Sequence, residues 1–403
     1  MSTAIVTEAA TAEPRELYGS FIDETIGIVA RQTRDTVSFA VGSPAPEALQ
    51  LVGADELAKA VIARDGGKAL GYGITEGDPE LRELIAAWTR DQRPEVNADE
   101  VIVTAGALQA IDLACRVFIR PGDVAVVESP GFTNALSALR NHGARVLEVP
   151  VDDDGLDVAA AESVLRAKDA RARLFFVVPN FQNPTGATLS LARRHMLVAL
   201  ARQHRAVIVE DDPYRLLRYR GADIPSLAAL ADGVTVVQTG SFSKTFLPGI
   251  RVGWAVARAE LVARMAAAKQ TMDLSTSSLG QRLVLEFARR GRFATHVDAL
   301  RALYAERQLR AHAALAREFD GTGVQWNDPH GGFYLWLRLP GGVSARRLLE
   351  VALEEGVAFV PGDAFAIERD HSAALRFSYS SPAPDRIDEG VRRLRRAFER
   401  VAA

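Results

Sequence analysis

One lysine in a serine-rich segment has the setting that covalent chemistry requires. The segment Gly-Ser-Phe-Ser-Lys-Thr-Phe contains Ser241, Ser243 and Lys244, and Arg251 follows seven residues after the lysine. A lysine among hydroxyl groups is usually a solvated surface charge. Apolar residues on both sides of this one indicate that the segment is partly buried. Because desolvation lowers the pKa of an amine, a buried lysine is more readily activated as a nucleophile toward an aldehyde.

The groups around Lys244 are also suited to a phosphate. Two serine hydroxyls and the guanidinium of Arg251 can all donate hydrogen bonds to an anion. A semi-buried amine next to a phosphate site is what a Schiff-base cofactor needs. We therefore predict pyridoxal phosphate (PLP) on Lys244, provided that other parts of the chain supply partners for its ring and for a substrate.

The elements that must position these groups are predicted from the apolar pattern. Strand-like apolar segments alternate with helical patterns such as 107–118 and 191–204. The predicted strands are 101–104, 124–128, 145–151, 174–179, 207–211, 234–239 and 252–257. Several are nearly continuous apolar runs, which are typical of strands covered on both faces. The alternation predicts an α/β fold with a mostly parallel, seven-stranded sheet in a large domain.

After about residue 260 the pattern changes to long helical stretches and short strands, which predict a smaller α+β domain. We expect a helical stretch over 280–319 that is broken near Gly291, strands at 332–339 and 375–380, a helix at 345–355 between them, and an amphipathic last helix over 384–401. The expected organisation is a disordered leader (1–15), an N-terminal segment that joins the small domain (16–45), a large PLP-binding domain (46–290) and the small domain (291–403).

Polar and aromatic groups follow the predicted strands, at the sheet edge where open α/β sheets bind ligands. After strand 101–104, Gly106 allows a tight turn, and the N–H groups of Ala107 and Leu108 open a helix that could bind a phosphate. After strand 124–128, Phe132 could stack on a flat ring. Each feature also has a plain structural explanation, as a strand-to-helix turn or as a packed aromatic side chain.

Further polar groups follow strands 174–179 and 207–211. Asn183 precedes a proline, which favours extended geometry and could aim its amide at a phenolate oxygen; a turn residue is an equally good interpretation. Asp211 ends strand 207–211, where a buried carboxylate needs a partner such as a protonated pyridine nitrogen. Tyr214 could reach the same oxygen as Asn183, and Asp212 could cap a helix. Candidate ligand-binding groups thus follow five of the predicted strands. We interpret this arrangement as one cofactor site, because five such coincidences are improbable.

A substrate carboxylate requires its own cation. Arg376 alternates with apolar residues on the short strand 375–380, and a charge in a half-buried strand is usually paired. A guanidinium matches a carboxylate in bidentate geometry. We therefore predict that Arg376 binds the substrate; a structural salt bridge is the alternative.

Composition excludes several other classes of function. The net charge of −3 gives no reason to expect nucleic acid or an anionic membrane as a partner, and no apolar stretch is long enough to span a bilayer. The single cysteine, Cys115, forms no internal disulfide, and the first residues lack the pattern of a signal peptide. We expect a cytoplasmic protein with no metal site.

From about residue 20 onward, the chain resembles the fold-type I PLP-dependent aminotransferases of class I/II. The motifs that carry the resemblance are Tyr-Gly at 72–73, Gly-Asp-Pro-Glu-Leu-Arg at 77–82, Thr-Ala-Gly-Ala-Leu-Gln at 104–109, Asn-Pro-Thr-Gly at 183–186, Glu-Asp-Asp-Pro-Tyr at 210–214, Ser-Phe-Ser-Lys at 241–244 with Arg251, and Leu-Arg at 375–376. Within this class the chain is similar to the 2-aminoadipate/kynurenine aminotransferases and to the effector domain of MocR-type regulators.

The resemblance implies roles for individual residues. Lys244 would carry the cofactor and shuttle a proton, Asp211 would pair with the pyridine nitrogen, and Asn183 and Tyr214 would hold the ring's phenolate oxygen. Phe132 would stack on the ring. The phosphate would be held by Gly106, Ala107, Leu108, Ser241, Ser243 and Arg251.

The resemblance also implies substrate contacts and an assembly. Arg376 would take the substrate α-carboxylate, and Gly42 would offer a backbone contact near the substrate. Tyr72 would reach the phosphate of the neighbouring subunit, which implies a homodimer with shared sites. Two departures from the family matter. Ala107 replaces a frequent Ser or Thr, and Gly27 stands where aminoadipate-type relatives often have an Arg, which puts a dedicated aminoadipate or glutamate role in doubt.

The implied activity is transfer of the α-amino group of an L-amino acid to a 2-oxo acid, expected to be 2-oxoglutarate, by ping-pong chemistry. One alternative is another PLP reaction on the same scaffold, such as oxidation, decarboxylation or elimination. A non-catalytic regulator of MocR type is less favoured, because only about 40 residues precede the motifs, too few for a winged-helix DNA-binding domain.

Overall fold

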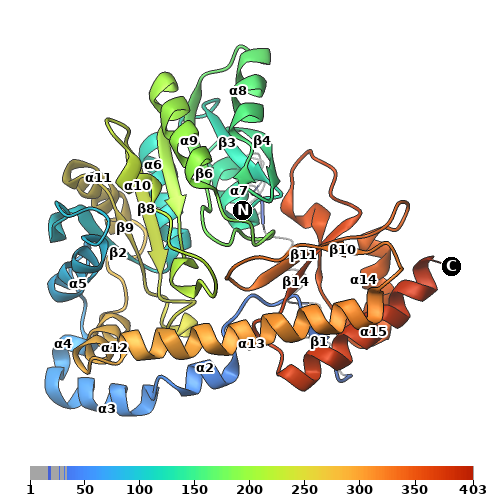
Figure 1. Cartoon of the computed structure of the whole chain (residues 1–403). Helices are drawn as coiled ribbons and strands as arrows, with labels where there is room; N and C mark the ends of the chain where they lie inside the picture. Colours follow the sequence, from blue (N-terminus) through green and yellow to red (C-terminus); the bar gives the residue numbers. More distant parts are fainter. Residues whose placement is uncertain (1–16, 20–26, 28–30, 32–33, 403) are drawn as a thin grey trace, which may run out of the picture.

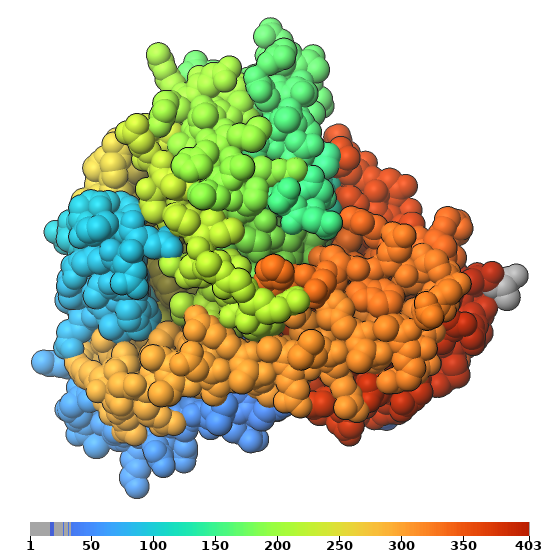
Figure 2. All heavy atoms as spheres, viewed as in Figure 1, coloured from blue at the N-terminus to red at the C-terminus, as the bar shows by residue number. Residues whose placement is uncertain are grey.

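The computed structural model describes residues 17–19, 27, 31 and 34–402. The predicted leader, 1–15, lies outside these residues. Figure 1 shows a large central sheet covered by helices, a smaller sheet beside it, and the long helix α13 (Phe293–Phe319) running past both. The space-filling view shows that the two parts are in contact along α13, which is drawn in light orange (Figure 2). Among the described residues, no helix is both long and apolar enough to cross a bilayer.

The large sheet contains all seven predicted strands. Its order is β2-β9-β8-β7-β6-β3-β4-β5. The strands are β2 (Val101–Thr104), β3 (Val124–Ser129), β4 (Arg145–Asp152), β5 (Gly155–Leu156), β6 (Ala172–Val177), β7 (Val207–Asp211), β8 (Val236–Ser241) and β9 (Gly253–Val256). The neighbours from β8 to β4 are parallel, whereas β9 is antiparallel to β2 and β8. The short β5 adds an eighth strand, antiparallel to β4, that the sequence analysis did not predict.

Strand β3 shows why the strands read as continuous apolar runs. Ala125 and Val127 pack into the core on one face of the sheet. Val124 and Val126 pack into a separate core on the opposite face. Because alternate side chains of a strand point to opposite faces, a strand buried on both faces must be apolar at every position.

Helices cover both faces of this sheet. The helices of this part are α4 (Gly67–Leu70), α5 (Pro79–Thr89), α6 (Ala107–Phe118), α7 (Thr133–Asn141), α8 (Val158–Ala167), α9 (Leu191–His204), α10 (Leu227–Leu230), α11 (Ala259–Gln270) and α12 (Ser278–Arg289). The core of one face includes side chains of α6, α7 and α11. The core of the other face includes side chains of α8, α9 and α10.

The smaller sheet has the order β10-β11-β14-β13. Its strands are β10 (Gln325–Trp326), β11 (Tyr334–Arg338), β13 (Val360–Pro361) and β14 (Ala374–Ser378), and it is covered by α14 (Ala345–Glu354) and α15 (Pro384–Ala402). The predicted break near Gly291 is confirmed: α12 ends at Arg289, Gly291 has a φ of +66°, and α13 begins at Phe293.

The segment that precedes the large sheet lies against the smaller one. Strand β1 (Val37–Ser38) pairs in parallel with β12 (Val357–Ala358). Residues 39–45 then continue from β1 into α2 (Pro46–Gln50) and α3 (Ala54–Asp65). This path carries Gly42 past the smaller sheet on the way to the large one, and so brings it between the two.

Candidate active site

Lys244 lies in the turn after β8, where its amine has one hydrogen-bond partner among the described residues. Its Nζ donates to the carbonyl oxygen of Gly42 at 2.7 Å. Burial lowers the pKa of this amine; Tyr334 raises it, and the nearby cations Arg376 and Arg251 lower it further. The amine is therefore biased toward the neutral, nucleophilic form that the sequence pattern predicted.

On one side of Lys244 lies a cluster of hydrogen-bond donors. The Ser241 hydroxyl donates to Ser243 Oγ at 2.9 Å, and the backbone N–H of Ser243 donates to Ser241 Oγ at 3.0 Å. The Arg251 guanidinium donates to Ser243 Oγ at 3.4 Å, and Arg251 itself has a φ of +53°. The turn therefore directs two hydroxyls and one guanidinium to the same place.

The start of α6 faces the same cluster. Gly106 precedes this twelve-residue helix with a φ of +83°, and no side chain caps the helix. The positive φ favours glycine at this position, and a Cβ there would also displace the end of the Arg251 side chain. The uncapped N–H groups of Ala107 and Leu108, together with Arg251 and the serines, form a cradle suited to a phosphate.

Asp211, at the end of β7, forms the other side of the site. Its buried carboxyl group accepts one hydrogen bond, from Thr239 on β8 at 2.7 Å. Burial raises the pKa of Asp211 to about 7, and Asp212 contributes in the same direction. A buried carboxyl group with so little compensation is stabilised by an N–H or cationic partner, such as a protonated pyridine nitrogen.

Arg376 lies on β14 without a carboxylate partner. Its guanidinium donates to Asn183 Oδ1 at 2.8 Å and to the carbonyl oxygen of Ala40 at 2.6 Å, and its Nε makes no hydrogen bond. Within the described part of the chain we find no ion pair for this buried cation, so the salt-bridge alternative is not supported. Since Arg376 engages the amide oxygen of Asn183, the amide nitrogen is left to donate elsewhere.

Tyr334 belongs to the site and was missed by the sequence analysis. Its hydroxyl lies 3.0 Å from the hydroxyl of Tyr214, and its ring centre lies 4.5 Å from the Arg376 guanidinium. A Cβ on Gly42 would overlap the Tyr334 hydroxyl, which therefore fills the space beside the residue that binds Lys244. One sequence signal was available: Tyr334 is a polar-tipped aromatic residue on the predicted strand 332–339. The structure pairs this strand with the strand of Arg376.

The remaining predicted residues occupy different environments. Phe132 precedes α7 and packs against the core, and the N–H of Gly131 next to it donates to Phe365 of the smaller part at 2.8 Å. Tyr72 is 90% exposed and so is not enclosed in the site of its own chain.

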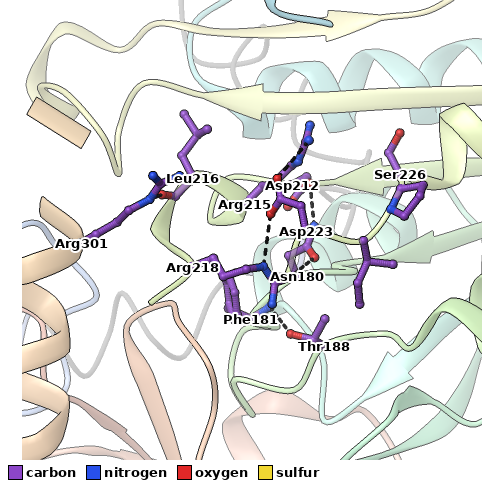
Figure 3. Close-up of polar contacts among 12 residues, drawn as sticks. Asn180, Phe181, Thr188, Asp212, Arg215, Leu216, Arg218, Asp223, Ser226 and Arg301 are labelled. Atoms are coloured by element: carbon purple, nitrogen blue, oxygen red, sulfur yellow. Dashed lines mark hydrogen bonds and ion pairs between the residues drawn. The ribbon is translucent and has the colours of Figure 1, made fainter. Parts of the chain in front are cut away.

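A polar network fixes the loops that carry Asn183, Asp211 and Tyr214 (Figure 3). Asn180, after β6, donates from Nδ2 to Asp212 Oδ2 at 2.8 Å and accepts from Arg218 at 3.3 Å. Arg218 also donates to Asp223 at 3.2 Å, tying the loop to its own far end. Asp212 therefore braces two strand-end loops, and the suggestion that it caps a helix was wrong.

These groups fit PLP at each of its polar ends. A phosphate would meet the Arg251 cradle, a ring nitrogen would meet Asp211, and an aldehyde carbon would meet Lys244. Asn183 and Tyr214 are the described groups with hydrogen-bonding capacity for a ring oxygen, and Arg376 is left for a substrate carboxylate.

Comparison with known proteins agrees with this chemistry. Residues 34–394 match the family model described as aminotransferase class I and II. The chain is 40% identical to the 2-aminoadipate transaminase of Thermus thermophilus over 91% of each chain. It is 35% identical to aromatic-amino-acid aminotransferase 1 of Thermococcus litoralis, over 94% of this chain and 91% of that one.

A solved structure gives the same result for the fold. The alpha-aminoadipate aminotransferase of Thermus thermophilus, complexed with N-(5'-phosphopyridoxyl)-L-leucine, superposes with a TM-score of 0.88 at 38% identity. The match covers 96% of both chains. The ligand in that structure joins a phosphopyridoxyl group to an amino acid.

Proposed function

The chain belongs to the class I and II aminotransferases, and on that premise we propose that Lys244, Asp211, Asn183, Tyr214 and Arg376 form its catalytic centre. The enzyme is a PLP-dependent aminotransferase that moves the α-amino group of an L-amino acid to a 2-oxo acid. The observation that carries the residue assignment is the position of the Lys244 amine. Lys244 is half-buried, its amine bonds to the carbonyl oxygen of Gly42, and the charges of Asp211, Arg376 and Arg251 all act on its pKa.

Each side chain has one task in the proposed centre. Arg376 binds the α-carboxylate of the substrate and orients its α-carbon. Lys244 takes the α-proton and returns it at the cofactor, for which a neutral amine is required. Asp211 holds the ring nitrogen, and Asn183 and Tyr214 donate to the ring oxygen. PLP, when bound, supplies an electron sink for bonds made and broken at the α-carbon.

The phosphate of the cofactor is assigned to Ser241, Ser243, Arg251 and the first N–H groups of α6. Ala107 offers only its backbone N–H where many relatives offer a hydroxyl as well. Gly106 contributes by letting the chain approach Arg251. Phe132, at the start of α7, is assigned to the face of the ring.

The two parts of the fold divide these tasks. We assign cofactor binding to residues 46–290, and we assign the carboxylate side of the substrate site to residues 16–45 and 291–403. The pairing of β1 with β12 supports this division, as does the bond from Arg376 to Ala40.

A homodimer is supported by an apolar surface beside the site. The exposed apolar side chains there are Leu70, Tyr72, Ile74, Leu108, Met272 and Leu274. These side chains come from three segments that lie side by side. The backbone N–H of Gly73 donates to the Ser275 hydroxyl at 3.3 Å, and the Gln109 amide donates to Asp273 at 2.9 Å. A second copy covering this surface would bury Tyr72 near the partner's phosphate cradle. For localisation we propose the cytoplasm, since the single cysteine is free and buried.

The function is tested by half-reactions of the purified holoenzyme. We expect an L-amino acid donor to convert the cofactor to its amine form, with one 2-oxo acid released per subunit. The screen compares aliphatic, aromatic and acidic donors, because the relatives named above include both 2-aminoadipate and aromatic enzymes. If 2-oxoglutarate is the acceptor, glutamate must also act as a donor. If glutamate is the one donor that does not convert the cofactor, 2-oxoglutarate is not the acceptor. If no donor converts the cofactor, the proposed catalytic centre is contradicted.

A further inference from the structure

Two buried tyrosines meet where the proposed function needs one hydroxyl. The hydroxyls of Tyr214 and Tyr334 lie 3.0 Å apart, and their rings meet edge to face with centres 5.8 Å apart. Both side chains are almost completely buried. Tyr214 comes from the loop after β7 and Tyr334 from β11, so the contact joins the large sheet to the smaller one.

A count of protons sets the direction of this hydrogen bond when the cofactor is bound. A phenol has one O–H to donate and lone pairs to accept. Between the two tyrosines, one donates and the other accepts. If the Tyr214 hydroxyl donates its hydrogen bond to the ring oxygen of the cofactor, it cannot also donate to Tyr334. Tyr334 must then be the donor to Tyr214.

The charges around the pair favour the same direction. Burial, reinforced by Tyr334, raises the pKa of Tyr214 well above its usual value. Burial also works to raise the pKa of Tyr334, but Arg376 and Lys244 outweigh it and the pKa is lowered. The hydroxyl with the lower pKa is the stronger hydrogen-bond donor, so these charges favour Tyr334 as the donor and Tyr214 as the acceptor. Lys244, Arg376 and Tyr214 are the groups that act on Tyr334. Tyr334, Arg376 and Asp211 are the groups that act on Tyr214.

We propose that Tyr334 is a positioning residue that donates its hydroxyl proton to Tyr214 in the holoenzyme and thereby directs the Tyr214 hydroxyl to the cofactor's ring oxygen. The inference rests on the proposed function of Tyr214. Tyr334 acts through Tyr214 and strengthens it as a donor, because hydrogen bonds in a chain polarise one another. Gly42 leaves the space that the Tyr334 hydroxyl occupies, so the relay also depends on that glycine.

The test is the pH titration of the visible absorbance of the resting holoenzyme. A strong hydrogen bond to the ring oxygen lowers its negative charge and so disfavours protonation of the conjugated system. Tyr334→Phe weakens Tyr214 as a donor, and the titration midpoint should rise by about 0.3 to 1 pH unit. Tyr214→Phe should raise it by more. In the Tyr214→Phe background, adding Tyr334→Phe should produce no further shift.

A control and a second probe separate the relay from a packing defect. Tyr379→Phe removes another buried hydroxyl, which donates to the carbonyl oxygen of Gly332 at 2.9 Å, and should leave the midpoint unchanged. Placing 3-fluorotyrosine at position 334 makes that hydroxyl a stronger donor and should lower the midpoint. A packing defect has no reason to reverse sign between these variants.

The outcomes separate this inference from the proposed function. A Tyr334→Phe midpoint equal to that of the Tyr379→Phe control overturns the relay, as does an undiminished shift in the Tyr214→Phe background. In both cases the native absorbance and half-reactions remain, and the proposed function stands. If the native protein shows no visible band at all, the proposed function fails first.

Discussion

The Nζ of Lys244 lies 2.7 Å from the carbonyl oxygen of Gly42, a residue 202 positions earlier in the chain. Gly42 belongs to the segment that passes from β1, on the smaller sheet, to α2. The amine is therefore held by backbone of the N-terminal segment, on the substrate side of the site. The position of the Lys244 amine therefore depends on the position of the segment that contains Gly42.

Replacing Gly42 by Ala should disturb both Lys244 and Tyr334. The new Cβ would overlap the Tyr334 hydroxyl, and overpacking of this kind typically costs about 1–3 kcal/mol. We expect lower stability in urea unfolding and a lower half-reaction rate. Gly341→Ala, where a Cβ meets nothing within 4 Å, should change neither. Adding Tyr334→Phe should recover part of the lost stability; no recovery would show that the damage lies elsewhere.

Arg376→Gln should impair recognition of the substrate carboxylate. Losing one partner of a buried charge pair costs about 2–5 kcal/mol, so kcat/KM for amino acid donors should fall by roughly 30-fold to several thousand-fold. The rate with a simple primary amine, which has no carboxylate, should change much less. An equal loss for both kinds of donor would contradict the assignment. It would indicate instead that Arg376 acts by holding Asn183.

Glu128 should make stability depend on pH. Burial raises the pKa of Glu128 to about 8, whereas in the unfolded chain this carboxyl has its ordinary pKa of 4.5. Between these values the folded state holds one proton more than the unfolded state. Stability is therefore lost as the pH rises, by up to about 1.4 kcal/mol per pH unit. Glu128→Gln should flatten this slope in urea unfolding between pH 6 and 7.5.

An exposed glutamate on α13, Glu306, provides the matched control for Glu128. Glu306→Gln should leave the slope as in the native protein. Other buried acids with raised pKa values, Glu210 and Asp211, are present in all three proteins, so their effect cancels in the comparison. Identical slopes in the native protein and in Glu128→Gln would mean that Glu128 ionises normally.

The strands and most helices followed from the sequence because their patterns are local. All seven predicted strands are present, and the break at Gly291 falls where a positive φ ends one helix before the next begins. Strands β6 and β8 are shifted by two residues from the prediction. After β6, Val178 is buried as deeply as the strand itself, and β8 continues to Gly240 and Ser241 because these residues pair with β9.

The parts of the site that the sequence did not reveal depend on contacts between distant segments. The pairing of Tyr334 with Tyr214 requires β11 to pack beside the loop after β7, and no local pattern encodes that contact. The role suggested for Asp212 was wrong for the same reason. A helix cap formed with nearby backbone was suggested, but the carboxylate accepts a hydrogen bond from Asn180, which follows another strand.

Shared active sites can be tested with hybrid dimers. Tyr72→Ala and Lys244→Ala should each lower the activity of the respective homodimer. Mixing the two variants should restore one native site per hybrid dimer, with about half of the native activity, because the site that keeps Lys244 then receives Tyr72 from the other subunit. Hybrids no more active than their parents would show that Tyr72 does not act across an interface.

The central claim is that Lys244 carries the cofactor, and borohydride reduction followed by peptide mass analysis tests it most directly. Of the chain's five lysines, Lys269 provides an internal comparison, because it is also buried but its Nζ is held by Asp273 at 2.8 Å. We expect a phosphopyridoxyl group on the peptide that contains Lys244 and on no other. A modification on Lys269, or no modification in protein that retains its visible absorbance, would contradict the account.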